Sequence, residues 1–409
     1  MSLDHIFDRR TATLALPCAL VACGGAAAPS HASRAATATA PNAGASDAVT
    51  APAATNAASP SAAHASTACV KGATLKVHFY DAGQALSALV TLPDGRRWLV
   101  DAGESPTRTG CGGACEAWHE GVMAGLRRDL GGLRLDGLWI THQHSDHLGG
   151  APDVLRTFGA ALYVDNGVVS GTHAHTRAHD GAQSGAHDVA GGVHDTVTNV
   201  ARRAASESGA RLRVVDPDHA DTPIASSPSV TITPIVPIKW PARCPSDPNA
   251  CSIALRIDYC ESSILFTGDA PSDEESALDT RGEVTLLQVG HHGSDTSTSA
   301  AFVRRLAPRY AVIASGKPDE GTNKGYCHPR ATTVRTLTAA MGGAGKGTVR
   351  SYDGKRCDAA HADAAGTADG NGWIDVPSSD HLWATARDGD VELRTIGDGV
   401  FSRAPSSGP

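Results

Sequence analysis

Residues 138–150 constrain this chain more than any other stretch, with the sequence Leu-Trp-Ile-Thr-His-Gln-His-Ser-Asp-His-Leu-Gly-Gly. The apolar start predicts the end of a buried strand, and the glycine pair predicts a break after it. Four strong metal ligands stand between them, namely His142, His144, Asp146 and His147. Because side chains two apart in an extended segment share a side, the two leading histidines can reach one ion. A turn then lets Asp146 and His147 reach a second ion.

This ligand set combines imidazoles with a carboxylate and contains no thiolate, which suits zinc, manganese or iron. The alternative is a solvated polar loop without a metal. Three histidines and one aspartate within six residues, directly after a strand, are improbable by chance. The sequence therefore predicts a metal centre at 142–147, with zinc as the expected metal and manganese as the alternative.

Two later segments repeat the pattern of an apolar strand that ends in possible ligands. Residues 263–267 form an apolar run that ends in Gly268-Asp269, which places a carboxylate at the edge of a sheet. A turn aspartate that caps the next helix is the alternative for Asp269. Residues 284–289 form a second run, which ends in Gly-His291-His292-Gly-Ser. Earlier in the chain, alternating apolar residues predict strands over 75–79 and 88–92.

The segment 138–150 resembles the signature of the metallo-β-lactamase superfamily. The resemblance covers about residues 74–399 and implies an α/β (α+β) fold, a four-layer αββα sandwich with one or two metals at one edge. Several runs are similar to the hydrolase domain of the ComEC-type branch of competence DNA-uptake proteins: Asp81-Ala-Gly-Gln84, Asp101-Ala-Gly103, the His-His-Gly-Ser run and His328-Pro329. That branch usually continues its first turn with Gly-Asp-Ser/Ala, whereas this chain has Ala85-Leu86-Ser87. This difference weakens any detailed inference about the substrate from the branch. Residues 382–385 and 389–393 resemble the terminal hairpin of the branch.

The resemblance implies two divalent metals that share a bridging hydroxide, which acts as the nucleophile. No protein nucleophile is then required. The implied ligands are His142 and His144 at metal one, Asp146, His147 and His292 at metal two, and Asp269 as the bridge between them.

The roles of the remaining candidate residues stay open at this stage. Relatives with a single histidine before the Gly-Ser pair favour His292 as the ligand, so that His291 faces the substrate together with His328. Asp146, His291 and His328 are the expected catalytic residues. The superfamily normally has a further histidine before the strand that leads to the bridging aspartate. The nearest residue here is Asn249, a weak ligand.

The first 70 residues predict export. Arg9 and Arg10 precede a short apolar run, and Leu20-Val-Ala-Cys23 resembles the lipobox of bacterial lipoproteins. We expect a signal peptide over 1–22, lipidation of Cys23, a disordered Ala/Ser/Thr/Pro-rich tether over 23–70 and a hydrolase domain over 71–403. An ordinary secretory signal is the alternative. The expected product is a lipid-anchored protein that faces the periplasm or the cell surface, with no transmembrane helix in the mature chain.

Cysteine usage agrees with export, since eight cysteines remain after Cys18 and Cys23 are set aside. An even number in an exported chain favours disulfides, and we expect Cys111–Cys115 and Cys244–Cys251. A thiolate zinc site at the first pair is the alternative. Between residues 173 and 194 lies a histidine-rich run that either captures metal or is a solvated loop.

The net charge of −8 argues against a general basic surface that would hold nucleic acid, although a local basic groove is compatible with it. The leading hypothesis is an exported metal-dependent hydrolase of phosphodiester or phosphate-ester bonds, in small molecules or nucleic acid. A β-lactam or lactone hydrolase is one alternative, and a non-catalytic metal-binding surface lipoprotein is another. The sequence does not predict an oligomeric state.

Overall fold

The computed structural model describes residues 72–168, 196–218, 220, 222–244, 246–354, 357 and 372–405. The expectations for the signal peptide, for Cys23 and for the tether lie outside these residues, as does the histidine-rich run at 173–194. Among the described helices, none has the length and apolar character needed to cross a membrane.

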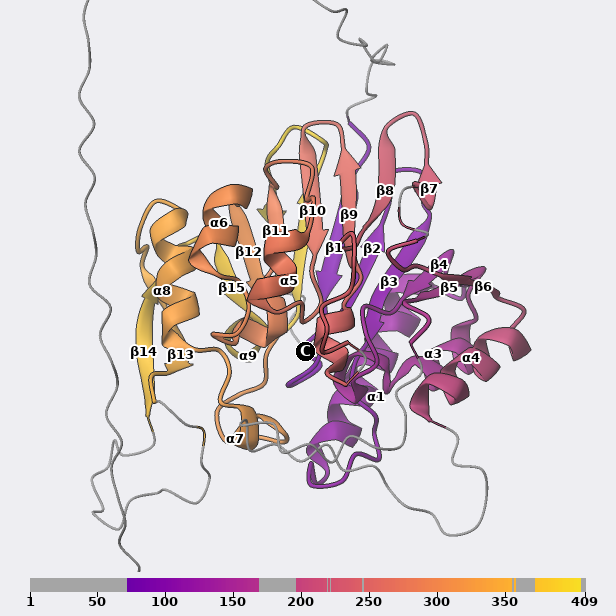
Figure 1. Ribbon diagram of the computed structural model, residues 1–409, viewed down its shortest axis with the longest axis horizontal. Coiled ribbons are helices and arrows are strands. Elements are labelled where there is room, and N and C mark those ends of the chain that lie inside the picture. The colour runs from indigo at the N-terminus through magenta and orange to yellow at the C-terminus, as the bar shows by residue number, and fades with distance from the viewer. Residues whose placement is uncertain are drawn as a thin grey trace, which may run out of the picture. The chain divides into compact units, whose positions relative to one another are not determined.

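One large sheet has eight strands in the order β17-β16-β1-β2-β3-β4-β5-β6 (Figure 1). From β3 to β6 the neighbouring strands run parallel, so their carboxyl ends lie at one edge. The strands are β1 (Leu75–Phe79), β2 (Ser87–Thr91), β3 (Arg97–Ala102), β4 (Gly137–Trp139), β5 (Leu162–Asp165), β6 (Arg211–Val214), β16 (Val391–Thr395) and β17 (Ser402–Arg403).

A second sheet has seven strands in the order β15-β12-β11-β10-β9-β8-β7. Its strands β10, β11, β12 and β15 are parallel, so a second set of carboxyl ends lies at one edge. The strands are β7 (Ala225–Ser226), β8 (Val230–Ile235), β9 (Ala254–Tyr259), β10 (Ser262–Phe266), β11 (Leu286–Gln288), β12 (Tyr310–Ile313) and β15 (Leu382–Ala384), and a separate hairpin joins β13 (Gly347–Tyr352) to β14 (Trp373–Ser378).

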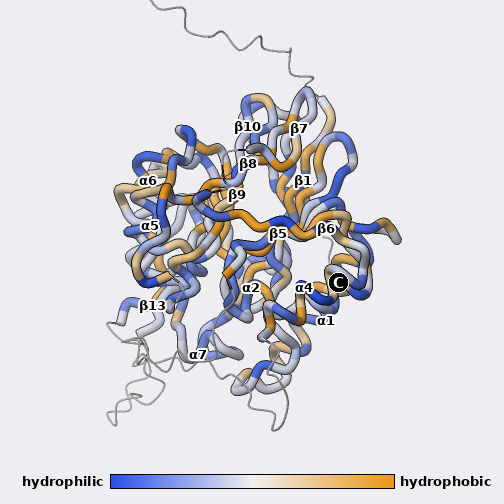
Figure 2. Tube along the Cα trace, turned by 45° about the vertical axis from the view of Figure 1, so that its right-hand side comes forward, coloured by the Kyte–Doolittle hydropathy of each residue, from blue (hydrophilic) through white to orange (hydrophobic). Residues whose placement is uncertain are grey.

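The two sheets pack face to face, and helices cover both outer faces. The inner core joins side chains of both sheets, for example Phe79 and Phe266, whose ring centroids lie 5.8 Å apart. In Figure 2 the strongly hydrophobic segments follow strands such as β1 and β5. The helices are α1 (Ala114–Leu130), α3 (Ala151–Phe158) and α4 (Val197–Glu207) over the first sheet, and α5 (Ser272–Ala277), α6 (Ala300–Leu306) and α8 (Ala331–Ala340) over the second. The predicted αββα sandwich is therefore confirmed.

The predicted terminal hairpin is wrong. β15 pairs in parallel with β12 of the second sheet, whereas β16 pairs antiparallel with β1 of the first sheet. The turn between them, α9 (Thr385–Asp388), carries the chain from one sheet to the other. Burial gives the reason, because all three residues of β15 are buried, as suits a parallel strand, whereas β16 alternates between buried and more exposed residues.

Both predicted disulfides, Cys111–Cys115 and Cys244–Cys251, are present. The alternative of a thiolate zinc site at the first pair therefore fails, because these sulfurs are bonded to each other. A third bridge joins Cys327 to Cys357 across 30 residues, and Cys260 is also disulfide-bonded. Sequence spacing could not select the long-range pair, since contact between such distant cysteines depends on the tertiary fold.

His78 on β1 lies between carboxylates that other elements contribute. Its Nδ1 lies 2.9 Å from Asp129 Oδ2 in the last turn of α1, and its Nε2 lies 3.1 Å from Asp390 Oδ2 directly before β16. Tyr80 stacks on the ring with centroids 4.4 Å apart, and its hydroxyl donates to Asp129. Burial alone would lower the pKa of His78, but the two neighbouring carboxylates outweigh it and raise that pKa to about 9.

His78 should therefore make the free energy of unfolding depend on pH. Because its folded pKa lies above the ordinary value of 6.5, its stabilisation is complete below pH 6.5 and is lost as the pH rises through 9. A shift of this size corresponds to about 3 kcal/mol. Urea unfolding at about pH 6 and about pH 9.5 should show a loss of this order in the wild type that His78→Gln lacks. His381→Gln, at an exposed position, is the control. An equal pH dependence in the wild type and in His78→Gln would contradict the expectation.

Candidate metal centre

Three strands deliver the candidate ligands to one edge of the sandwich. The chain leaves β4 of the first sheet and enters the short helix α2 (Ser145–Leu148), while β10 and β11 of the second sheet end nearby. Ligands therefore come from both sheets: His142 and His144 after β4, Asp146 and His147 on α2, Asp269 after β10, and His291 and His292 on the short helix η2 (Gly290–Gly293) after β11.

Five of these residues converge in a buried cluster, in which no residue as a whole is more than 8% exposed. His147 Nε2 lies 3.2 Å from Asp269 Oδ1 and 3.2 Å from His292 Nε2. His292 Nε2 lies 3.4 Å from Asp146 Oδ2 and 3.6 Å from Asp269 Oδ2. His142 Nε2 lies 3.9 Å from Asp269 Oδ2. The aspartate after β10 is therefore the common neighbour of the histidines.

Two overlapping groups of three ligand atoms can each surround a cation, and within each group the atoms lie within 4.8 Å of one another. The groups are His142 with His147 and Asp269, and Asp146 with His147 and His292. From sequence, His147 is expected to serve one metal only, whereas the geometry places it in both groups. His144 lies outside both groups, although its Nδ1 lies 3.1 Å from His142 Nε2.

The donor set fits a divalent metal. Asp269 Oδ1 is buried and accepts no hydrogen bond from the described residues, so a lone pair that needs a partner faces the histidines. The Nε2 atoms of His147 and His292 face each other at hydrogen-bond distance, an arrangement that brings two good metal donors together. Imidazole and carboxylate donors without thiolate suit zinc, manganese or iron.

Charges within the cluster shift its protonation. Burial favours the neutral acid of Asp269, but the nearby rings of His147, His292 and His291 outweigh burial and hold its pKa well below the ordinary value. Burial disfavours the charged form of His147 as well, yet Asp269 and Asp101 raise its pKa well above 6.5. Burial and the charge of His147 lower the pKa of His142 well below 6.5. The cluster thus contains carboxylates that are ionised at neutral pH, as cation binding requires.

Asp101, directly at the end of β3, orients His147. Its fully buried carboxylate lies 2.7 Å from His147 Nδ1 and accepts hydrogen bonds from the backbone and the hydroxyl of Thr141. This contact places the ring hydrogen on Nδ1 and leaves Nε2 to face the cluster. Asp101 has a left-handed backbone with φ of 55°, which is uncommon for a residue other than glycine. Asp101-Ala-Gly103 is one of the motifs that resemble the ComEC-type branch, but the sequence did not predict that Asp101 orients His147.

The backbone of η2 decides which of the two adjacent histidines enters the cluster. His291 and His292 have φ values of 49° and 54°, so both are left-handed, a conformation that persists where the surroundings impose it. His292 Nδ1 donates to the carbonyl of Ala314 at 2.7 Å, which leaves its Nε2 free to bind metal. His291 Nδ1 instead lies 2.9 Å from Thr296 Oγ1, and the ring remains outside both ligand groups.

Gln288 at the end of β11 fixes the turn that presents Asp269. Its Oε1 accepts from the backbone of Thr267 at 2.8 Å and of Gly268 at 3.0 Å, and its Nε2 donates to the Val289 carbonyl at 2.7 Å. Gly268 has φ of 55°, and a Cβ there would lie 2.6 Å from the Cβ of Thr141. Glycine is therefore required where the two sheets approach each other behind the cluster.

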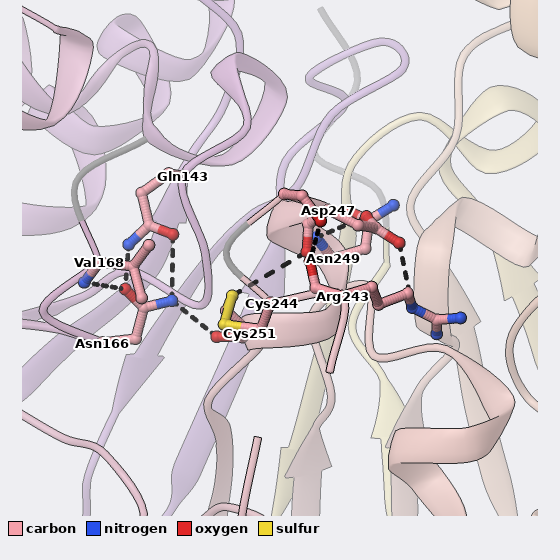
Figure 3. Close-up of a disulfide and its surroundings, with 9 residues drawn as sticks. Gln143, Asn166, Val168, Arg243, Cys244, Asp247, Asn249 and Cys251 are labelled. Atoms are coloured by element: carbon pink, nitrogen blue, oxygen red, sulfur yellow. Dashed lines mark hydrogen bonds and ion pairs between the residues drawn. A yellow bond between two sulfur atoms is a disulfide. The ribbon is translucent and has the colours of Figure 1, made fainter. Parts of the chain in front are cut away.

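Figure 3 shows how the Cys244–Cys251 loop supports the candidate metal-binding segment from the second sheet. The Asn166 amide donates to the Cys251 carbonyl at 2.6 Å and to Gln143 Oε1 at 3.0 Å, which anchors the residue between the two histidines at 142 and 144. Asn249 lies in the same loop, on the 3-10 helix η1 (Pro248–Cys251). Its Oδ1 is buried and has no hydrogen-bond partner among the described residues, so it keeps a free acceptor.

His328 lies beside the cluster and has a defined tautomer. Gln84 Oε1 accepts from the Gly316 backbone, so its amide nitrogen is the group that lies 3.2 Å from His328 Nδ1. The amide donates, Nδ1 accepts, and the ring hydrogen is then on Nε2. Burial and the neighbouring His291 and His292 lower the pKa of His328 well below 6.5. The rings of His328 and His291 meet edge to face with centroids 5.4 Å apart, which places both expected substrate contacts side by side.

Comparison with known proteins gives a family match and several relatives. Residues 80–224 match the family model described as the metallo-beta-lactamase superfamily. "Recombination protein 2" of Haemophilus influenzae is 26% identical over 250 residues, which are 60% of this chain and 24% of the relative. "Competence protein ComA" of Neisseria gonorrhoeae is 27% identical over 288 residues, 66% of this chain and 31% of the relative. The chain thus spans about a quarter to a third of the length of these relatives.

Among solved structures, the human tRNase Z, short form, is similar over 60% of this chain and 94% of its own chain, with 14% identity and a TM-score of 0.36. The MIM-2 metallo-beta-lactamase is similar over 49% of this chain and 59% of its own, with 17% identity and a TM-score of 0.28.

Proposed function

We propose that this chain, a metallo-β-lactamase-fold protein of the ComEC type and by fold a metal-dependent hydrolase, cleaves phosphodiester or phosphate-ester bonds outside the cytoplasm. The observation that carries the proposal is the buried convergence of ligand atoms from both sheets on Asp269. Two of the relatives are named for recombination and competence, which supports nucleic acid as one substrate. Disulfides in the described chain support an oxidising compartment, and a lipid anchor at Cys23 remains part of the proposal.

The two ligand groups support a role for each side chain in the cluster. His142 and Asp269 would hold one metal, and Asp146 and His292 would hold a second, while His147 Nε2 has one lone pair and would therefore bind only one of the two. Divalent metals at such a site activate water near neutral pH and neutralise charge on the attacked group, which suits phosphodiesters. His144 lies outside both groups, and its Nδ1 at 3.1 Å from His142 Nε2 supports a role as a further ligand for the first metal.

His328 and His291 would contact the substrate beside the metal centre. The Gln84 amide keeps the ring hydrogen of His328 on Nε2, so this ring donates a hydrogen bond without being positively charged. A donor beside the metals stabilises a leaving oxygen or a phosphate oxygen. His291, whose Nε2 lies 3.8 Å from Asp269 Oδ2, is the second contact on the same side.

Metal analysis paired with a substrate panel tests the proposal. Purified protein should contain a divalent metal by elemental mass spectrometry, and it should hydrolyse bis(p-nitrophenyl) phosphate or DNA. A chelator should abolish turnover, and added zinc or manganese should restore it. A chromogenic cephalosporin and a lactone serve as comparison substrates. A metal-loaded protein that cleaves either of these but no phosphodiester would overturn the choice of substrate, and loaded protein that cleaves nothing would favour a binding role.

A further inference from the structure

A polar cluster that the proposed metal ligands do not use lies next to Asp146. Arg108, in the segment after β3, lies 2.7 Å through Nη1 from Glu104 Oε2, and its Nη2 donates to the Tyr326 hydroxyl at 2.9 Å. Nη1 also donates to the hydroxyl of Ser145, the first residue of α2 and the neighbour of Asp146. The Arg108 guanidinium therefore binds the residue that directly precedes the candidate metal ligand Asp146 in the sequence.

Arg108 retains the capacity to bind a ligand. A guanidinium carries five N–H groups, and three hydrogen bonds go to Glu104, Ser145 and Tyr326. The Arg108 side chain is 14% exposed, whereas that of Glu104 is 2% exposed, so the carboxylate is the buried support and the guanidinium reaches the surface of the site. Planar guanidinium donors match the geometry of phosphate oxygens.

Tyr326 connects this cluster to the expected substrate contacts. Its ring centroid lies 6.0 Å from that of His328, and His328 lies 5.4 Å from His291. Arg108, Tyr326, His328 and His291 thus form one row of polar side chains along the side of the metal centre. An oligonucleotide presents successive charged phosphates, and polar side chains beside the metal centre can contact a phosphate next to the cleaved one.

Covalent and steric constraints hold the row in place. The segment with Arg108 leads into the Cys111–Cys115 disulfide, and Tyr326 directly precedes Cys327, which is bonded to Cys357. The ring of Trp118 packs against Gly321, where an added Cβ would lie 2.3 Å from the ring and 3.3 Å from Cys111 Sγ. Donors fixed before the substrate binds lose little entropy on binding, which favours recognition of an anion.

We propose that Arg108 and Tyr326 form an anion-binding subsite that takes a phosphate group of the substrate beside the metal centre. The inference deepens the proposed function and rests on it, because it names anionic phosphodiesters as the preferred substrates of this centre. Glu104 is a positioning residue in this scheme, since it holds the guanidinium without facing the row. A substrate with a second phosphate next to the cleaved phosphodiester, such as an oligonucleotide, gains most from the subsite.

Binding of inorganic phosphate to metal-loaded protein, followed by calorimetry, tests the subsite. Arg108→Gln should weaken phosphate binding about tenfold and Tyr326→Phe about threefold, since a hydrogen bond to a charged group is lost in each case. Arg108→Lys should recover part of the loss, because it keeps the charge but not the planar geometry. Arg335→Gln, which removes a surface arginine paired with Asp353 on the outer helix α8, should bind phosphate like the wild type.

Metal content and kinetics separate a binding role from a structural one. With metal content equal to that of the wild type, the variants should raise KM for a DNA oligonucleotide while kcat changes less, and KM for bis(p-nitrophenyl) phosphate, which has a single phosphate, should change less than KM for the oligonucleotide. Unchanged phosphate binding in both Arg108→Gln and Tyr326→Phe would overturn the subsite. If Arg108→Gln loses metal or does not fold, Tyr326→Phe decides, because it removes a single hydroxyl. If weaker phosphate binding appears but no phosphodiester is cleaved by the wild type, the subsite stands and the proposed function fails.

Discussion

Replacement of Asp269 by asparagine should abolish metal-dependent turnover and remove bound metal. The carboxylate contacts His147 at 3.2 Å and His292 at 3.6 Å, and it lies 3.9 Å from His142. Asparagine keeps the shape but loses the negative charge, and its amide nitrogen does not bind a cation. Loss of a residue that hydrogen-bonds to a metal ligand typically lowers metal affinity or activity by about 10- to 100-fold. Loss of a carboxylate that binds the metal directly and contacts these histidines should lower kcat/KM by more than about 100-fold.

Elemental mass spectrometry and turnover on bis(p-nitrophenyl) phosphate measure this effect together. Asp375→Asn is the matched control, because it removes the same charge from an exposed residue of β14 that pairs with Arg350. The control should keep both metal and activity. Full metal content in Asp269→Asn, with activity within a few-fold of the wild type, would contradict the assignment of Asp269 as a central ligand.

Asp101→Asn should give the second largest effect, a fall of about 10- to 100-fold in metal affinity. The Asp101 carboxylate holds the Nδ1 side of His147 at 2.7 Å and keeps Nε2 turned toward the cluster. Asparagine can present its amide nitrogen to the ring instead of an acceptor, which favours the wrong tautomer of His147. Thr141, whose backbone and hydroxyl donate to the same carboxylate, loses part of its support as well.

Titration of zinc against a chelating indicator measures this affinity at constant pH. Asp165→Asn is the control, because Asp165 lies at the end of the parallel strand β5 and pairs with Arg202 at 2.7 Å instead of with a cluster histidine. That variant can lose stability, but it should bind metal with unchanged affinity. Equal affinities in Asp101→Asn and the wild type would show that His147 is oriented by its packing alone.

Much of the site could be predicted because its ligands follow recognisable strand ends. Residues 142–147 are contiguous, so their chemistry is visible without any tertiary information. Asp269 and His292 each follow an apolar strand that ends at a glycine, and the fold does bring them beside His147. The strand boundaries were less accurate, because the apolar run over 284–289 narrows to β11 at Leu286–Gln288.

Contacts between distant segments could not be predicted. Gln84 meets His328, and Arg108 meets Tyr326 across 218 residues, only because the two sheets bring the ends of their strands together. Asp101 carried a visible signal, an aspartate directly after an apolar strand, which the same reasoning used for Asp269 would have found. The misplaced terminal hairpin has a related cause, since short apolar strands pair equally well with either sheet until burial of both sheets selects one.

By itself the sequence determined the ligand types and two local disulfides, because residue chemistry and short spacings are properties of adjacent residues, and its resemblance to the metallo-β-lactamase superfamily implied the sandwich class. Only the tertiary structure decided that His147 stands between two ligand groups, that His292 rather than His291 turns inward, and that a guanidinium lies beside Asp146. These outcomes depend on side-chain directions at the junction of two packed sheets, which no local pattern encodes.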